Sequence, residues 1–129
     1  MRASVPMTPQ ELKDRTKAFA VRCVAVAEAL PKSRAGDVFG KQLLRSGSSV
    51  AANYRSACRA KSKADFVSKI GTAIEEADET IYWLEMIAAV GLVSDKKLAK
   101  LTQEGNELVA ILTASSKTVQ RAIRAAKNG

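Results

Sequence analysis

Two neighbouring stretches decide the fold: Leu43–Ala57 reads LLRSGSSVAANYRSA, and Ile74–Glu85 reads IEEADETIYWLE. The first is small and basic, while the second is acidic and then aromatic. Core-facing positions recur through both at steps of three and four, which indicates two helices back to back. The small residues of the first would let neighbouring backbones approach closely on more than one face. We therefore predict that the rest of the chain is built around this pair of helices.

The composition favours an all-α domain. The chain has 129 residues, the usual length of one domain, and 47% hydrophobic and 26% charged residues are typical of a soluble globular protein. Aromatic residues make up only 5%, which disfavours a sheet. All three prolines lie at or before Pro31, so nothing after that residue forbids long helices.

The apolar periodicity predicts four helices with short connections. A capping-box pattern at Thr8 and Glu11 marks the first helix start. Short connections between long helices predict an antiparallel up-down-up-down four-helix bundle. Residues 1–7 show no pattern and are expected to form a disordered tail, which leaves residues 8–129 as a single domain. The helices are predicted at about residues 9–30, 36–61, 63–90 and 95–126.

The charge and the cysteines suggest a compartment and a class of partner. Lys and Arg number 21 and Asp and Glu 13, so the net charge is +8, and there is no His. RNA or DNA would suit such a charge, although a charge that serves only solubility is the alternative. Cys23 and Cys58 lie on different predicted helices without metal-ligand spacing, as expected in a reducing compartment. No stretch could span a bilayer and no signal-peptide pattern is present, so we predict a cytoplasmic protein with no membrane partner.

The residues that could carry catalysis lack their usual partners. Di-metal bundles use Glu-x-x-His pairs, and the chain has no His. The serines of Ser46–Ser49 have no base for acyl transfer, and close packing explains them better. We therefore predict no enzyme activity, no cofactor and no metal. Metal-assisted chemistry remains a remote alternative, based on the helix-three carboxylates Glu75, Glu76, Asp78, Glu79 and Glu85.

The two opening stretches resemble a known family. The motif Arg45–Arg55 (RSGSSVAANYR), then Arg59–Ser62 and Phe66, then Glu75–Glu79 and Trp83–Glu85, is similar to a bacterial four-helix-bundle family. That family includes proteins encoded in intervening sequences of 23S ribosomal RNA genes and accessory proteins of diversity-generating retroelements. The resemblance spans roughly residues 19–124.

The resemblance implies a homopentamer of four-helix bundles arranged as a barrel around a channel. In the retroelement branch it also implies binding to nucleic acid and to a reverse transcriptase. A common version of the motif has an acidic residue and Gly shortly after the Asn, where this chain has Ser56 and Ala57. The chain therefore looks closer to the stand-alone members.

Basic side chains on and around the second predicted helix are the candidates for nucleic-acid binding. No aromatic residues are interleaved with them, so contact with the phosphate backbone is expected rather than base reading. An ordinary solvated surface, or ion pairing with carboxylates, is the alternative. The candidate set is Arg22, Arg45, Arg55, Arg59, Lys61, Lys63 and Lys69.

A second set of residues is the candidate subunit interface. Trp83, Met86 and Ile87 form a second stripe beside the main apolar stripe of their helix, and Trp and Met are enriched at interfaces. A wide core stripe is the alternative. We also hypothesise ion pairs of Arg55 and Arg59 with Glu75 and Glu79, within or between subunits. The interface set is Leu44, Ser48, Ala51, Asn53, Arg55, Glu75, Glu79, Trp83, Met86 and Ile87.

The sequence thus predicts a non-enzymatic, oligomeric binding or scaffold protein. Its partners would be copies of itself and RNA or DNA, with a nucleic-acid enzyme such as a reverse transcriptase as a further partner. A structural homo-oligomer that acts only through protein–protein contacts is the alternative.

Overall fold

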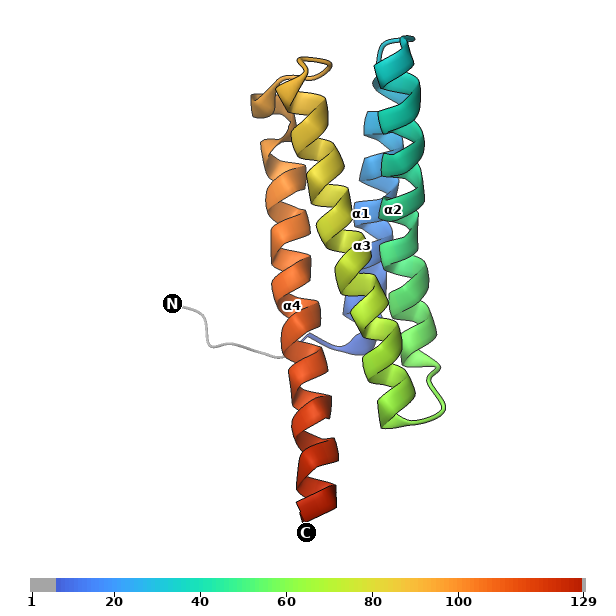
Figure 1. The fold of residues 1–129 in the computed structure, drawn as a ribbon, viewed down its shortest axis with the longest axis vertical. Helices are drawn as coiled ribbons and strands as arrows, with labels where there is room; N and C mark the ends of the chain where they lie inside the picture. Colours follow the sequence, from blue (N-terminus) through green and yellow to red (C-terminus); the bar gives the residue numbers. More distant parts are fainter. Residues whose placement is uncertain (1–6, 129) are drawn as a thin grey trace.

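The computed structural model describes residues 7–128 and contains four helices, with no strand among those residues (Figure 1). The all-α prediction is confirmed, and each helix end lies within three residues of its predicted position. The second helix was predicted at residues 36–61, whereas α2 begins two residues earlier and ends three residues earlier. The helices are α1 (Pro9–Ala29), α2 (Arg34–Cys58), α3 (Lys63–Ala89) and α4 (Asp95–Asn128).

Side-chain caps fix the helix starts. The Thr8 hydroxyl accepts a hydrogen bond from the Glu11 amide at 3.1 Å, and the Glu11 carboxylate accepts one from the Thr8 amide, which completes the predicted capping box. Ser33 caps α2 through the Gly36 amide at 3.0 Å, which explains why α2 begins before residue 36. Ser62 caps α3 in the same way.

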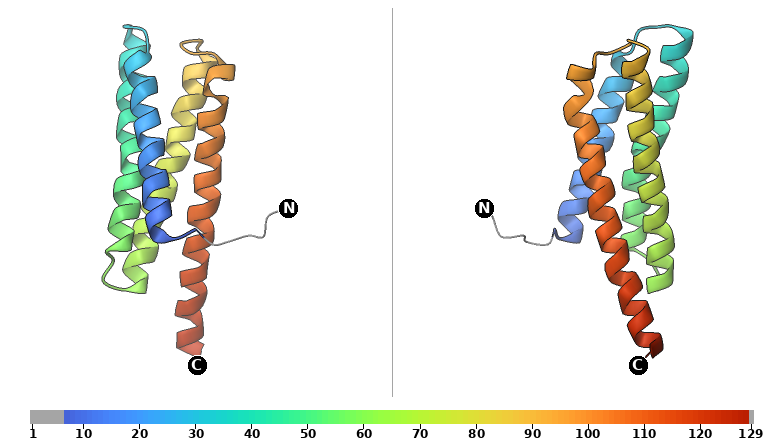
Figure 2. Two further views of the ribbon diagram at one scale, coloured as in Figure 1. Left: turned by 180° about the vertical axis from the view of Figure 1, so that it is seen from behind. Right: turned by 60° about the vertical axis from the view of Figure 1, so that its left-hand side comes forward.

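The helices lie side by side in a bundle. The α1–α2 and α3–α4 connections lie at one end and the α2–α3 connection at the other (Figure 2). Each helix packs mainly on its neighbours in the chain, whereas α1 and α4 meet along a much thinner seam. No helix among the described residues is long and apolar enough to cross a membrane.

The core fills the space between the four helices. Each helix contributes fully buried apolar side chains, led by Phe19, Leu43, Leu84 and Leu108. The predicted stripes are therefore the buried faces. Met7, which the sequence placed in a disordered tail, packs partly buried against this core. The other six residues of that predicted tail lie outside the described residues.

Small residues let the helices approach closely at two crossings, of which the sequence indicated the one at Gly47. A Cβ added at Gly47 of α2 would lie 2.8 Å from the Cys23 Cβ of α1. A Cβ added at Gly105 of α4 would lie 2.9 Å from the Ile81 side chain of α3. Both distances are too short for carbon atoms, so these helix crossings depend on glycine.

Candidate functional site: the hairpin and the basic surface

The α2–α3 hairpin is held together on its outer side by Arg45. Its guanidinium donates a hydrogen bond to Glu76 at 2.9 Å and another to Glu79, and it also contacts Gln42. Glu79 in turn accepts a hydrogen bond from the Trp83 indole N–H at 3.0 Å. An arginine on α2 therefore satisfies two carboxylates and, through one of them, orients the tryptophan.

The predicted ion pairs of Arg55 and Arg59 with Glu75 and Glu79 do not form within the chain. Glu79 pairs with Arg45 instead. No ion pair within residues 7–128 involves Arg55, Arg59 or Glu75. The reason is the register of the hairpin. The chain turns back after α2, so α3 runs alongside it in the opposite direction. Because Arg45 lies level with Glu76 and Glu79, Arg55 lies level with the region near Lys69. That region is more than one helical turn before Glu75.

A buried hydrogen bond sets the same register from the inside. The Thr80 and Ser46 hydroxyls are hydrogen-bonded to each other at 2.8 Å, the Thr80 hydroxyl also lies 2.7 Å from the Glu76 carbonyl of its own helix, and both side chains are fully buried. Asn53, nearby on α2, donates to the Ser49 carbonyl and hydroxyl at 2.9 and 2.8 Å. The hydroxyls of the serine-rich segment thus serve packing and intrahelical or interhelical hydrogen bonds.

A second ion-pair cluster closes the α1–α4 seam, and the sequence reasoning missed it. Arg15 donates two hydrogen bonds to Glu104, at 2.7 and 2.8 Å, and one to Glu107 at 3.1 Å. The hydrogen bonds from Arg15 hold the pKa of Glu104 below its ordinary value despite its partial burial. Only the register of two helices distant in sequence could have revealed this cluster.

No group of three or more His, Cys, Asp and Glu side chains comes together as a metal site among residues 7–128. The carboxylates Glu76 and Glu79 are instead occupied by Arg45. The two cysteines are free and differ in environment. Cys23 is fully buried, and burial raises the pKa of its thiol to about 12, whereas Cys58 is exposed.

The structure divides the predicted nucleic-acid-binding residues into paired and unpaired cations. Arg45 is engaged as described, and Lys69 bonds Asp65 at 3.1 Å. A backbone hydrogen bond from Lys61, and then the Lys69 ammonium, lower the pKa of Asp65. No ion pair within residues 7–128 involves the rest of the set: Arg22, Arg55, Arg59, Lys61 and Lys63.

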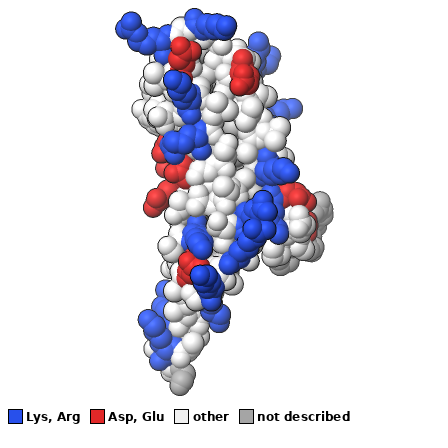
Figure 3. All heavy atoms as spheres, turned by 90° about the vertical axis from the view of Figure 1, so that its right-hand side faces the viewer, with Lys and Arg blue, Asp and Glu red and all other residues white. Residues whose placement is uncertain are grey.

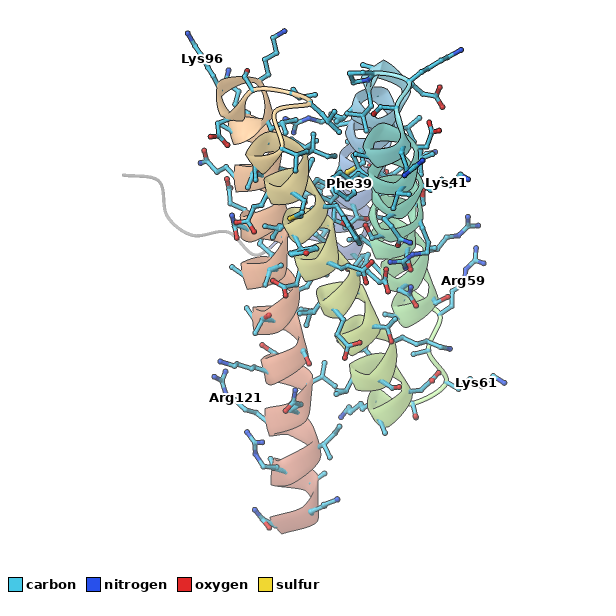
Figure 4. All side chains as sticks on the ribbon, turned by 45° about the horizontal axis from the view of Figure 1, so that its top comes forward. Phe39, Lys41, Arg59, Lys61, Lys96 and Arg121 are labelled. Carbon is cyan, nitrogen blue, oxygen red and sulfur yellow. The ribbon has the colours of Figure 1, made fainter. Side chains whose placement is uncertain are left out.

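Figure 3 shows Lys and Arg spread over one face of the bundle and along the projecting end of α4. That end is a basic segment missing from the predicted set. Its cations are spaced by three or four residues, and no acidic residue follows Glu107 in the chain. The spacing alone could have identified it. In Figure 4, Arg59, Lys61 and Arg121 point outward near this end of the bundle. The segment contains Lys117, Arg121, Arg124 and Lys127.

The predicted interface residues fall into three groups by exposure. Ile87 is fully buried in its own core, so its assignment to the interface is wrong; its side of α3 faces inward. Trp83 is partly buried, stacks on Phe39 with ring centroids 5.6 Å apart, and meets Tyr82 at 5.0 Å. The remaining partly buried members are Leu44, Ala51, Asn53, Glu79 and Met86, and the exposed ones are Ser48, Arg55 and Glu75.

Comparison with known proteins places this geometry in a family. Residues 10–114 match the model of the 23S rRNA-intervening sequence protein family. The chain belongs to this family. The resemblance of the α2 and α3 stretches is thereby confirmed, because the matched range contains both of them.

A solved structure agrees with the 23S rRNA-intervening sequence fold. It is a protein of unknown function from the S23 ribosomal protein family of Bacteroides thetaiotaomicron, 35% identical, with a TM-score of 0.79. The similarity covers 84% of this chain and 97% of that chain. None of the curated proteins matches the chain. The family match stops at Ala114, so the basic end of α4 lies beyond it.

Proposed function

We propose that this family member is a non-enzymatic scaffold that binds the phosphate backbone of RNA or DNA, as a homopentameric ring of antiparallel up-down-up-down bundles in the cytoplasm. The observation that carries the proposal is the distribution of unpaired cations. The ion pairs found within residues 7–128 use only three cations, Arg15, Arg45 and Lys69. The net charge of +8 is thus displayed on the surface.

Two unpaired groups lie toward the same end of the bundle. The α2–α3 connection and its borders carry Arg59, Lys61 and Lys63. The end of α4 carries the basic segment, which projects past the other helices (Figure 1). Cations on two elements at one end can contact successive phosphates, and such binding is not specific for sequence.

Assembly would multiply weak contacts. If copies form a ring, each basic end is repeated around it, and avidity raises the overall affinity without any new contact. The partly exposed Trp83 and Met86 give α3 an apolar outer edge that a neighbouring copy could cover. Free thiols in both cysteines suit a reducing compartment.

Titration of a fluorescent duplex of about 20 base pairs, followed by anisotropy at increasing salt, tests the nucleic-acid part. We expect log K to fall linearly with log salt, with a slope of about −0.9 for each phosphate neutralised. Replacing Lys117, Arg121 and Arg124 by Gln should make the slope shallower by about 2–3. The matched control replaces Lys96, Lys97 and Lys100, three exposed lysines of α4 near its other end. Absence of binding at low salt, or an equal effect of the control, would contradict the proposal.

Mass in solution tests the assembly part. A pentamer has five times the 13.8 kDa of one chain. Arg55→Ala should lower the mass if this unpaired arginine reaches a neighbouring copy. Glu79→Ala tests the same interface, but it also breaks contacts with Arg45 and Trp83 inside the chain. A monomer at micromolar concentration would refute the ring.

A purely structural homo-oligomer is the second candidate. Several large apolar side chains are exposed on the outer surface, at Val21, Val38, Tyr82 and Val90. Patches of this kind mark protein–protein contacts when they are contiguous. An oligomer that binds no duplex at low salt would favour this function over the first.

A further inference from the structure

The end of the bundle near the α2–α3 connection is one helix short. The first helix begins at Pro9, above the level of that connection, while α4 continues well past it (Figure 2). The missing turns of α1 leave a slot of about 980 Å³ whose walls come from the start of α1, the end of α2, the start of α3 and the middle of α4. The slot runs along Ile111–Val119 of α4, which is about two helical turns or 12 Å.

The walls of the slot are mainly apolar. Leu12, Ala57, Phe66, Ile111 and Val119 line it, and most of them are continuous with the core. An apolar slot that is open at the side where a helix has ended is the shape into which an amphipathic helix packs.

Tyr54 supplies a polar point within these walls. Its side chain is only 4% exposed and lines the slot, and its hydroxyl is paired with the Cys58 thiol one helical turn away. Burial and, next, the neighbouring Cys58 thiol raise the pKa of Tyr54, so it stays a neutral donor.

The rim of the slot is basic. Lys61 and Lys63 line it, and no carboxylate does. On the adjoining face of α4, a shallow depression that shares Ala114 and Thr118 with the slot adds Lys117 and Arg121. The complementary occupant is therefore apolar on one face and acidic along its edges.

The basic rim argues against two occupants that the protein itself could supply, its own N-terminal residues and a second copy of the chain. Residues 1–6 precede Met7, which lines the slot, but they contain Arg2 and no acid. A second copy carries +8 and an equally basic α4 end. A phosphate backbone would suit the rim but not the apolar walls.

We propose that the slot binds an acidic amphipathic helix of a partner protein, which takes the place of the missing turns of α1. Apolar side chains of the helix at positions i, i+3/i+4 and i+7 pack on the walls, and its flanking carboxylates face the lysines of the α2–α3 connection and the cations of α4. The choice of a helix rests on the apolar walls, whereas its acidic edges rest on cations that the proposed function assigns to phosphates, so the two ligands would compete for the rim.

The test uses two labelled peptides of about 14 residues with the same Leu and Ala positions, one with Glu and one with Lys at all other positions. We expect the Glu peptide to bind the full-length protein and the Lys peptide to bind at least ten times more weakly. Bound Glu peptide should also slow alkylation of Cys58, which is exposed and lines the slot. This second readout locates the peptide.

Matched variants identify the slot as the site. Ala114→Trp places a bulky side chain in it from an exposed position and should weaken binding at least tenfold, while Ala99→Trp, exposed near the other end of α4, should not. Replacing Lys61 and Lys63 by Gln should weaken binding about two- to thirtyfold, as expected for two exposed charge pairs. Replacing Lys96 and Lys97 is the charge-matched control.

Other occupants give other results, and each of them overturns the proposal. Equal binding of both peptides, or an Ala114→Trp protein that binds normally, would exclude the slot. A lower assembly mass for Ala114→Trp would identify a second copy as the occupant. A ready disulfide between Cys58 and the variant Ser4→Cys would identify the N-terminal residues. RNA binding that Ala114→Trp weakens as much as it weakens binding of the Glu peptide would identify nucleic acid as the occupant of the slot.

Discussion

The same substitution at two glycines should have opposite effects on stability. Gly47 of α2 and Gly71 of α3 both lie inside helices, where Ala is favoured over Gly by about 1 kcal/mol. At Gly71 a Cβ meets nothing within 4 Å, so Gly71→Ala should raise the free energy of unfolding by about 0.5–1 kcal/mol. At Gly47 the added Cβ lies 2.8 Å from the Cys23 Cβ and 3.0 Å from its sulfur.

The Cys23 Cβ is attached to the α1 backbone, so no side-chain rotation can move it, and the two helices must separate. Overpacking of this kind costs about 1–3 kcal/mol, and a fixed neighbour places Gly47→Ala at the upper end. After the gain in helix propensity, we expect a net loss of about 2 kcal/mol.

Urea unfolding followed by circular dichroism, at one fixed protein concentration because the chain is proposed to assemble, measures both effects. With a slope of about 2 kcal/mol/M, Gly47→Ala should lower the midpoint by about 1 M, and Gly71→Ala should raise it by about 0.3–0.5 M. If Gly47→Ala is as stabilising as Gly71→Ala, the close approach of α1 and α2 is refuted.

Three further predictions concern single groups. Thr80→Val should lower the free energy of unfolding by about 1–3 kcal/mol because it strands the buried hydroxyl of Ser46, and the added Ser46→Ala change should cost little more in a double-mutant cycle. The pKa of Glu104 is lower in the folded than in the unfolded protein, so its ionised carboxylate stabilises the fold above pH about 4.3, the ordinary pKa of Glu. This stabilisation is lost as the pH falls through the pKa of the folded protein. Glu104→Gln should therefore make the free energy of unfolding depend less on pH in the acid range. Iodoacetamide at neutral pH should label Cys58 alone in the native protein and should label Cys23 only after denaturation, as counted by mass spectrometry. Rapid labelling of both cysteines in the native protein would contradict the buried position of Cys23.

The helices were predictable because their signals are local. Periodicity, the capping box at Thr8 and Glu11, and the absence of proline after Pro31 each act within a few residues. The family was predictable for the same reason, since its motif lies within one hairpin. The close approach at Gly47 could be expected from the run of small residues around it, although its partner Cys23 could not be named.

The contacts between helices were not predictable, because they depend on register. The hairpin brings Glu79 level with Arg45, ten residues from Arg55, and the spacing of four within each charged pair carries no information on which residues of the two helices lie level. The Arg15–Glu104 pair joins positions 89 residues apart. The slot depends on the relative heights of three helix ends and leaves no pattern in the sequence at all.

The charges of the protein fall into two systems that can be changed separately. The pairs that join helices use Glu76, Glu79, Glu104 and Glu107, and they take up carboxylates that would otherwise offset the surface cations. The cations left over include those on the α2–α3 connection and the end of α4, which form no ion pair within residues 7–128. Because exposed unpaired cations contribute little to stability, neutralising the α4 end should change ligand binding while unfolding stays within about 0.5 kcal/mol of the original. Neutralising Arg45 should instead act on the hairpin itself, because it leaves two carboxylates without their shared partner. A loss of binding that accompanies the first change but not the second would therefore report on the ligand surface and not on the fold.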